Sequence, residues 1–388
     1  MPDAAAPATA SPGHNTASDH QRVEAVDMLR GAALLGILLV NARMIAGTPH
    51  PSRTGTADWA AAVVVAFFAE IKFYPLLAFL FGVSMVLAMG EQGTALRRTR
   101  ESRYLRRLSA LFLLGAAHLV FLFGGDILTT YALVGAAAHL LRNAAARTLL
   151  LVGAGTMLAF FTCFLALAVW FALSAQHVQE APYPTPELIA AYQAGAAETL
   201  AAHLSLLPSY VFGSAFFSPH VFACVLLGMA AGKTGLLERE WQSARLRRTA
   251  LVSAAVGVPG SVVYAMVSYT PSLVAWSMPG RAVAVITGPA LTVTYACMAL
   301  MLLRSGRSAR LVGLLAKAGR NTLSHYLGQS IVLCFVFTGY GLGLYGRIGG
   351  PVLVAGCVGL FAVQLLLTDR YHGGKGPAEA FVRAIQGR

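Results

Sequence analysis

The sequence predicts an all-α, polytopic integral membrane helix bundle of about ten transmembrane helices. Hydrophobic residues make up 57% of the 388 residues and charged residues only 12%, whereas about a quarter of the residues of a soluble domain are charged. Several apolar runs exceed the roughly 20 residues that a helix needs to cross a hydrocarbon core of about 30 Å. With basic residues gathered in alternate loops, these observations lead us to expect a multi-pass protein of the cell membrane.

The apolar runs predict ten spans. In chain order they cover residues 27–47, 59–90, 105–123, 127–141, 148–175, 208–232, 249–270, 281–303, 321–345 and 351–369. The second run is long for one crossing, and Pro75 in "EIKFYP" leaves open a kinked or tilted helix or a break into two helices. Residues 27–370 would form the transmembrane domain. We expect residues 1–26, which start with a stretch rich in Ala, Pro, Thr and Ser, to be a disordered cytoplasmic tail, and residues 371–388 to be a second cytoplasmic tail.

The charges of the loops set the expected orientation. The loop 91–107 holds six arginines, and further Lys and Arg residues follow spans four, six and eight. The alternate loops differ, because 176–207 has three glutamates and no Lys or Arg, and 271–280 has no charged residue. Cytoplasmic loops carry an excess of Lys and Arg, so both termini are predicted to be cytoplasmic.

Composition and motifs argue against several classes of protein. The net charge of +13 comes largely from arginines in loops between spans, so we expect no nucleic-acid partner. The five cysteines lie in apolar segments without CxxC spacing, which argues against disulfides and a structural zinc site. The chain has no HExxH, no P-loop, no GxGxxG after a strand and no GxSxG, so we predict no metal cofactor.

The apolar stretch "AAHLVFLFGGDILTTYAL", residues 116–133, carries His118 and Asp126 eight residues apart. Span three would run outward and span four back, and the glycines 124 and 125 would permit a tight outer turn. Asp126 could cap span four, and His118 could bond a neighbouring helix. However, ionisable groups inside a membrane are often functional, and a carboxylate can orient a nearby imidazole and raise its basicity. We therefore predict His118 as a catalytic base that Asp126 orients.

Other polar groups stand in or beside the apolar runs. Asp27 and Arg30 lie at i and i+3, with Asn41 on the same helix stripe. An anchoring ion pair is one interpretation of the first two, and direct chemistry is the other. Glu70 and Lys72 are two residues apart and do not face each other on a helix, so each needs another partner or the helix is broken there.

The ninth span opens with a polar face. Asn321, His325 and Gln329 fall at i, i+4 and i+8, directly after Arg320. Such a face lines a cavity or bonds a neighbouring helix rather than facing lipid. His50 lies in the outer loop 48–58, where a histidine is more often incidental.

Six segments, taken together, resemble the YeiB-like family of bacterial membrane proteins. They are "DMLRGAALLGILLVN", "KFYPLLAFLFG", "HLVFLFGGDILTTYAL", "LLGMAAGKTGLL", "GRNTLSHYLGQS" and "GPAEAFVR". They occur in family order and cover nearly the whole chain. Where the family commonly has Thr-Asn-Tyr, this chain has Ser324, His325 and Tyr326, which weakens a family-wide role for His325.

The family is distantly similar to the transmembrane acyltransferases, which include heparan-α-glucosaminide N-acetyltransferase and bacterial O-acyltransferases of surface sugars. The shared feature is Asp-x-x-Arg-Gly in the first span and a polar residue near its outer end, here Asp27, Arg30, Gly31 and Asn41. The heparan enzyme carries its active histidine in the loop after that span. His50, followed by Asp58 at a different spacing, occupies a similar place here, so the resemblance implies His50 as a second candidate catalytic histidine.

These features predict an acyltransferase that moves an acetyl or other acyl group from cytoplasmic acyl-CoA to a hydroxyl or amine of a glycan, lipid or small metabolite. We expect Arg30, Arg320 and Asn321 to bind the donor. The residues expected to bind the substrate along its path are Asn41, Glu70, Lys72, His325 and Gln329. The alternative is a transporter or flippase of a small or amphipathic solute, which broken helices and midplane charges suit. A non-catalytic scaffold fits the number of buried ionisable groups less well. The expected partners are the lipid bilayer and the acceptor, and we allow for a homodimer.

Overall fold

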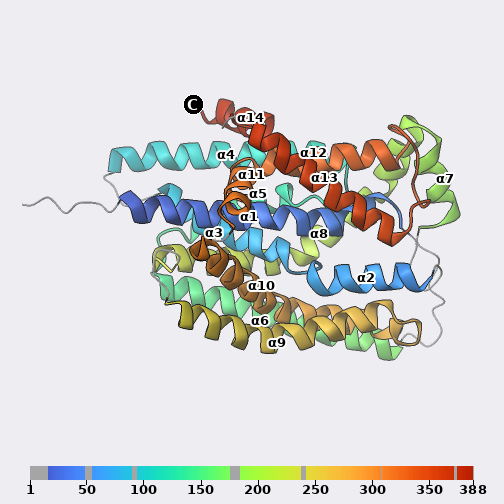
Figure 1. Ribbon diagram of the computed structural model, residues 1–388, viewed down its shortest axis with the longest axis horizontal. Coiled ribbons are helices and arrows are strands. Elements are labelled where there is room, and N and C mark those ends of the chain that lie inside the picture. The colour runs from blue at the N-terminus through green and yellow to red at the C-terminus, as the bar shows by residue number, and fades with distance from the viewer. Residues whose placement is uncertain are drawn as a thin grey trace, which may run out of the picture.

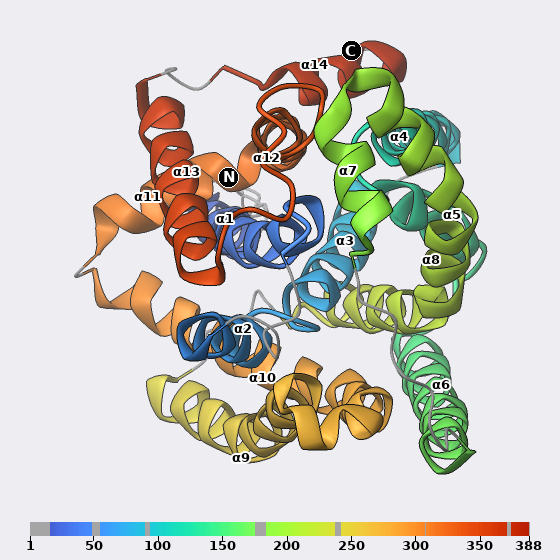
Figure 2. The same cartoon turned by 90° about the vertical axis from the view of Figure 1, so that its right-hand side faces the viewer.

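The computed structural model describes residues 16–48, 55–89, 94–174, 184–236, 242–306, 308–370 and 374–387. All regular secondary structure in these ranges is helical, which confirms the predicted all-α class. In chain order the helices are α1 (Thr16–Ile45), α2 (Thr56–Phe68), α3 (Phe73–Met89), α4 (Thr94–Phe121), α5 (Leu128–Leu140), α6 (Ala146–Ser174), α7 (Pro186–Ala194), α8 (Ala196–Lys233), α9 (Ser243–Tyr269), the 3₁₀ helix η2 (Pro271–Trp276), α10 (Ser277–Ser305), α11 (Ala309–Arg320), α12 (Thr322–Phe337), α13 (Gly350–Arg370) and α14 (Pro377–Gln386). Most of the long helices run along the longest axis of the molecule (Figure 1), and α1 lies near the middle of the bundle when it is viewed end-on (Figure 2).

The candidate spans agree with the predicted map. Among the described residues, eight helical segments are long and apolar enough to cross a membrane, namely α1, α2 with α3, α4, α6, α8, α9, α10 and α13. The two remaining predicted spans, 127–141 and 321–345, coincide with the shorter apolar helices α5 and α12. At the edge of the bundle, α6 exposes Leu151, Leu158 and Trp170, an apolar surface of the kind that marks membrane contact. The chain is therefore a multi-pass membrane helix bundle.

The structure corrects one predicted boundary and adds a helix at the C-terminal end. α1 begins at Thr16, so residues 16–26 are helical rather than part of a disordered tail. The segment contains Gln, Arg, Glu and Ala, which are good helix formers, and it continues directly into the first span. Within the predicted tail 371–388, α14 packs against α4 and α12.

The second apolar run is two helices, which resolves the alternative that the sequence left open. α2 ends at Phe68 and α3 begins at Phe73. Between them Ile71 has a φ of +63°, a left-handed conformation that costs a residue with a Cβ roughly 1–2 kcal/mol. Pro75 stands in the first turn of α3, where its missing N–H costs no helical hydrogen bond.

The polar groups exposed by this break are satisfied by neighbouring elements. Lys72 is fully buried, and its Nζ donates to the carbonyl oxygen of Ala66 at 2.7 Å. The Thr292 hydroxyl of α10 donates to the carbonyl oxygen of Lys72 at 2.8 Å. The break is thus held by bonds from α2 and α10 and is a defined part of the fold.

α1 and α11 cross at very short range through two glycines. A Cβ on Gly31 would lie 2.0 Å from the carbonyl oxygen of Leu315, and a Cβ on Gly319 would lie 1.8 Å from the carbonyl oxygen of Asp27. Small residues allow such close approach of membrane helices. The crossing brings Arg30 of α1 close to Arg320 at the end of α11, where both line one cavity.

Candidate functional site

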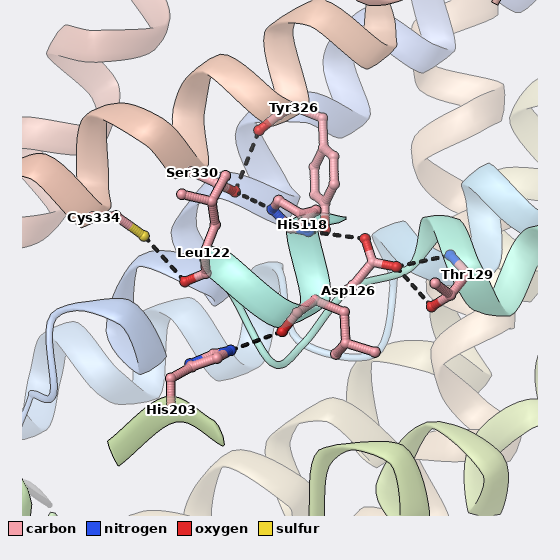
Figure 3. A network of polar contacts seen from close by, with 9 residues as sticks. His118, Leu122, Asp126, Thr129, His203, Tyr326, Ser330 and Cys334 are labelled. Carbon is pink, nitrogen blue, oxygen red and sulfur yellow. Dashed lines mark hydrogen bonds and ion pairs between the residues drawn. The ribbon is translucent and has the colours of Figure 1, made fainter. Parts of the chain in front are cut away.

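A buried hydrogen-bond chain links α4, the turn before α5, and α12 (Figure 3). His118 Nδ1 lies 2.9 Å from Asp126 Oδ1, and His118 Nε2 lies 2.8 Å from Ser330 Oγ. None of the three residues is more than 2% exposed. An ionised carboxylate only accepts hydrogen bonds, so Nδ1 of a neutral ring donates to Asp126 and Nε2 accepts from the Ser330 hydroxyl. The structure therefore brings together the two residues singled out in the sequence and adds a serine.

Asp126 also caps α5. Its Oδ2 accepts bonds of 2.7 Å from both the backbone N–H and the hydroxyl of Thr129, in the first turn of that helix. The sequence offered a helix cap and a partner for His118 as alternatives. Both occur, because each oxygen atom of the carboxylate serves one of them.

The expected reason for the two glycines before Asp126 is corrected. Neither Gly124 nor Gly125 has a positive φ. Instead, a Cβ at Gly124 would collide with the ring of Tyr210, and a Cβ at Gly125 with the ring of Phe123. The glycines make room for aromatic rings beside the turn.

Ser330 is the member of the chain that the sequence analysis missed. It lies 212 residues from His118 along the chain, and a lone serine on an apolar helix has no local signature. Tyr326, one turn earlier on α12, lies against the pair, with its ring centroid 5.0 Å from that of His118 (Figure 3). The one feature of the sequence that could have pointed to Ser330 is its place on α12, directly after Gln329, the last residue of the polar face.

An arginine-lined cavity of about 160 Å³ opens on one side of this chain. We call it the arginine cavity, and its polar lining includes Arg30, Arg107, Arg320 and Glu379. Its lining also includes Tyr326, so it reaches the residue that covers His118. The arrangement concentrates positive charge around a partly apolar space, which suits an anionic ligand with an apolar arm.

A second cavity of about 320 Å³ lies on the other side, and we call it the tyrosine cavity. Its lining includes Tyr74, Asp126, Ser209, Tyr210 and Arg281. The lining is mostly apolar and includes one arginine and a few hydroxyl-bearing side chains, around a space large enough for a small ligand or one end of a larger one.

The two cavities meet at the hydrogen-bond chain but open at different depths. Ile127 and Tyr131 line both cavities. On α1 the arginine cavity extends from Arg30 to Ile37, and the tyrosine cavity touches Met44, seven residues beyond Ile37, or roughly 10 Å at 1.5 Å per residue. His118 lines neither cavity, but it contacts Tyr326, which lines the first, and Asp126, which lines the second.

At the mouth of the arginine cavity, the pair predicted on the first span is formed. Arg30 Nη1 lies 3.2 Å from Asp27 Oδ1, and Arg30 also donates to the hydroxyl of Ser84 on α3. Arg107 stands beside them with its guanidinium carbon 5.7 Å from the centre of the Phe81 ring. The anchoring ion pair exists, and the same arginine also faces the cavity.

The polar face of α12 bonds other elements and lines neither cavity. His325 Nε2 lies 2.9 Å from the Thr368 hydroxyl, and Gln329 Nε2 donates to Gln364 Oε1 at 2.9 Å, both on α13. Asn321 accepts from the N–H of Gly376 and donates to the carbonyl of Gly374. Of the two alternatives for this face, bonding between helices fits these contacts.

Glu70 belongs to a second polar cluster at the far end of α1. It accepts hydrogen bonds from the hydroxyls of Tyr264 and Tyr269 and lies 3.5 Å from Arg43. Arg281 donates to the Tyr264 hydroxyl at 3.4 Å and lines the tyrosine cavity. Glu70 and Lys72 line neither cavity, and Glu70 is joined to the tyrosine cavity through Tyr264 and Arg281.

Tyr74 connects the tyrosine cavity to a histidine that the sequence did not single out. Its hydroxyl donates to His220 Nδ1 at 3.0 Å, and His220 Nε2 donates to the carbonyl of Val285 at 3.2 Å. The Tyr131 hydroxyl donates to the carbonyl of Tyr74 at 2.6 Å. These contacts fix the position of two tyrosines that line the cavity.

The residues predicted near the outer end of the first span are not part of this chain of contacts as far as the structure describes them. His50 lies outside the described residues. Asp58, its proposed companion, accepts from the N–H of Gly350 at the start of α13. Asn41 is half-buried on α1 and lines neither cavity.

Comparison with known proteins supports the family resemblance. The family model described as "Protein of unknown function (DUF418)" matches residues 231–387. The chain is 29% identical over 376 residues to the uncharacterised protein YxaH of Bacillus subtilis (strain 168), covering 90% of each chain. It is 25% identical over 373 residues to an uncharacterised 39.9 kDa protein in the amylase 3′ region of Bacillus acidopullulyticus, covering 90% of this chain and 88% of the relative. It is 26% identical over 391 residues to the uncharacterised protein YeiB of Escherichia coli (strain K12), covering 94% of this chain and 96% of YeiB. The chain is thus similar over about nine-tenths of its length to three uncharacterised proteins, YeiB among them, and its residues 231–387 match the family model described as "Protein of unknown function (DUF418)".

Proposed function

We propose that this protein is an acyltransferase of the cell membrane. It moves an acetyl or other acyl group from cytoplasmic acyl-CoA to a hydroxyl or amine of a glycan, a lipid or a small metabolite. The observation that carries this proposal is that the His118–Asp126 pair adjoins two cavities, an arginine-lined one through Tyr326 and a second one that Asp126 itself lines. Acyl transfer needs two substrates and a base, and this arrangement provides a place for each.

The arginine cavity suits the donor. Arg30, Arg107 and Arg320 can bind the phosphates of CoA through charge-assisted hydrogen bonds. A volume of about 160 Å³ is below the size of an ordinary ligand pocket, so only the acyl-bearing arm enters, and the nucleotide stays at the mouth. The rest of the lining is largely apolar and fits that arm. It includes Leu34, Ile37, Leu77 and Leu111.

The tyrosine cavity suits the acceptor. Its lining hydroxyls and Arg281 can bind a polar acceptor, and the Asp126 side of the catalytic pair faces it. In this arrangement Asp126 holds the His118 ring in the tautomer whose Nε2 can take a proton. The reaction then needs no passage of CoA across the membrane.

Purified protein in lipid nanodiscs tests this proposal. We expect it to transfer label from radiolabelled acetyl-CoA to a component of a membrane extract, and His118→Gln to abolish transfer with unchanged folding. His139→Gln is the matched control, because His139 is also a buried histidine of the bundle and lines neither cavity. Failure of the wild-type protein to transfer label from acetyl-CoA or a longer acyl-CoA would argue against the enzyme.

The donor side has its own test. Arg320→Ala should weaken binding of CoA about tenfold or more, since a hydrogen bond to a charged group contributes about 1.5–3 kcal/mol. Arg310→Ala is the control, because Arg310 is exposed on the same helix and does not line the cavity. Equal CoA affinity in both variants, measured by calorimetry, would remove the arginine cavity as the donor site.

Transport is the second candidate, and one observation favours it. Two cavities at different depths are separated by Ile127 and Tyr131, and the broken helix pair α2–α3 borders one of them at Ile71. Transporters commonly place a site between such elements. Movement of a solute across proteoliposomes without an acyl donor would favour this function over transfer.

A further inference from the structure

We propose that Ser330 is the nucleophile of the reaction and carries the acyl group as an ester between two half-reactions. This inference rests on the proposed acyltransferase function and adds a covalent step to it. It follows from the hydrogen bonds of His118, the position of Ser330 on α12, and the two cavities.

The first argument is that both ring nitrogens of His118 are already engaged. Nδ1 bonds Asp126 at 2.9 Å and Nε2 bonds Ser330 at 2.8 Å. No ring nitrogen is left for a hydroxyl or amine of a bound acceptor. The proton that His118 can take in this arrangement is the one on Ser330, and removal of that proton makes the serine oxygen a nucleophile.

The second argument concerns where the serine hydroxyl points. Serine and threonine side chains on helices commonly bond the carbonyl four residues earlier. Thr287 and Thr338 do so, at 2.9 and 2.8 Å. Ser330 Oγ lies 3.4 Å from the corresponding carbonyl of Tyr326 but 2.8 Å from His118. Its hydroxyl is therefore directed at the imidazole rather than at its own helix.

The third argument is that the hydrogen-bond chain that ends at Ser330 adjoins both cavities, although Ser330 itself lines neither. Tyr326, one turn before it, lines the arginine cavity, and Asp126, at the other end of the hydrogen-bond chain, lines the tyrosine cavity. A shift of the Tyr326 ring would connect the donor side to Ser330. An acyl group held on this oxygen would lie between the two substrates, so neither has to cross to the other side.

The chemistry balances without another reactant. Ser330 Oγ attacks the thioester carbonyl while its proton moves to His118 Nε2. The carbon–sulfur bond breaks, and CoA leaves as a thiol with the proton from His118. The acceptor hydroxyl or amine then attacks the serine ester and gives its proton to His118. The bond to Ser330 Oγ breaks, and the serine recovers its proton from His118.

An acceptor-free incubation tests the covalent step. Wild-type protein with acetyl-CoA should release about one CoA per protein in a burst and gain the mass of one acetyl group, which peptide mapping should place on Ser330. Ser330→Ala should lose both signals and at least about 1,000-fold of the rate of transfer. Ser261→Ala, which changes another buried serine, should behave as wild type.

The possible failures can be told apart. A Ser330→Ala protein that transfers acetyl at a rate within about threefold of wild type would refute the serine nucleophile and leave the acyltransferase standing. Wild-type transfer without a burst or an acetylated Ser330 would also refute it. Should Ser330→Ala misfold, Ser330→Cys keeps a nucleophile at this position and must then carry the acetyl group as a thioester. If the wild-type protein shows neither transfer nor labelling with any acyl-CoA, both proposals fail.

Discussion

Asp126 has two carboxylate oxygen atoms, and each serves a different part of the molecule. Oδ1 orients His118, and Oδ2 accepts two hydrogen bonds from Thr129 at the start of α5. A substitution of Asp126 therefore changes both the orientation of the His118 ring and the capping of α5. The two effects can be separated by a side chain that keeps the cap and loses the charge.

We expect Asp126→Asn to retain the fold and lose activity. The Asn carbonyl can still accept from Thr129, so the free energy of unfolding should change by less than about 1 kcal/mol. The Asn amide then faces His118 Nδ1, favours the opposite tautomer and leaves Nε2 without a lone pair for the Ser330 proton. Acyl transfer should fall by about 10²–10⁴-fold. A thermal melt and a transfer assay on the same preparation check this, and near-normal transfer would reduce Asp126 to a helix cap.

At this scale the sequence showed only half of the site. His118 and Asp126 are close along the chain, and ionisable groups in an apolar stretch are conspicuous. Ser330 is neither, because its contact with His118 depends on the packing of distant helices. Arg107 was missed for the same reason, because its place in the cavity also depends on helix packing. In the sequence it is one of several arginines in a basic loop, and only the structure shows that it lines the arginine cavity.

At the scale of the elements, hydrophobic periodicity and helix-breaking residues predicted where the helices lie. They did not predict which neighbouring elements bond to them. The break between α2 and α3 was suggested by Glu70, Lys72 and Pro75. Its bonding partners come from α9 and α10, and Ile71 adopts a conformation that no sequence rule predicts for a β-branched residue. The sequence also indicated the polar face of α12. Its spacing of four residues is the same whether the face lines a cavity or packs against α13, so the sequence did not decide between the two.

The crossing of α1 and α11 gives a matched test on one helix. Gly319→Ala places a methyl group 1.8 Å from a carbonyl oxygen of α1, so we expect a loss of stability of about 1–3 kcal/mol. Gly313→Ala has nothing within 4 Å and should stabilise α11 by up to about 1 kcal/mol through helix propensity. Melting temperatures of the two variants in the same detergent should move in opposite directions. A fall of equal size in both would mean that the close crossing is not a determinant of stability.

For the whole molecule, hydropathy predicted about ten crossings, and the helices agree with that map. It could not predict the two cavities, because each is built from segments far apart in the sequence. Arg30, Arg107, Arg320 and Glu379 come from four different helices. A cavity of this kind is a property of tertiary packing, which a sequence read locally does not contain.

The predicted orientation can be checked with exposed positions at the two ends of the bundle. In a variant without native cysteines, Glu187→Cys on α7 should react with a membrane-impermeant maleimide in intact cells, because the loop 176–207 is predicted to face outward. Arg310→Cys on α11 should react only after the cells are permeabilised. The reverse pattern would invert the topology and move the arginine cavity to the outer side, away from cytoplasmic acyl-CoA.

The placement of α14 has a consequence for how this protein is made. Glu379 of α14 follows α13, the last candidate span among the described residues. It lines the arginine cavity and accepts hydrogen bonds from the first turn of α12. Chains are synthesised from the N-terminus at about 5–20 residues per second, so every candidate span is synthesised before this side chain exists. A nascent chain can hold a complete set of membrane helices and still lack one wall of the arginine cavity. Residues made after all the candidate spans therefore complete this cavity, and a chain that stops before α14 lacks the Glu379 wall.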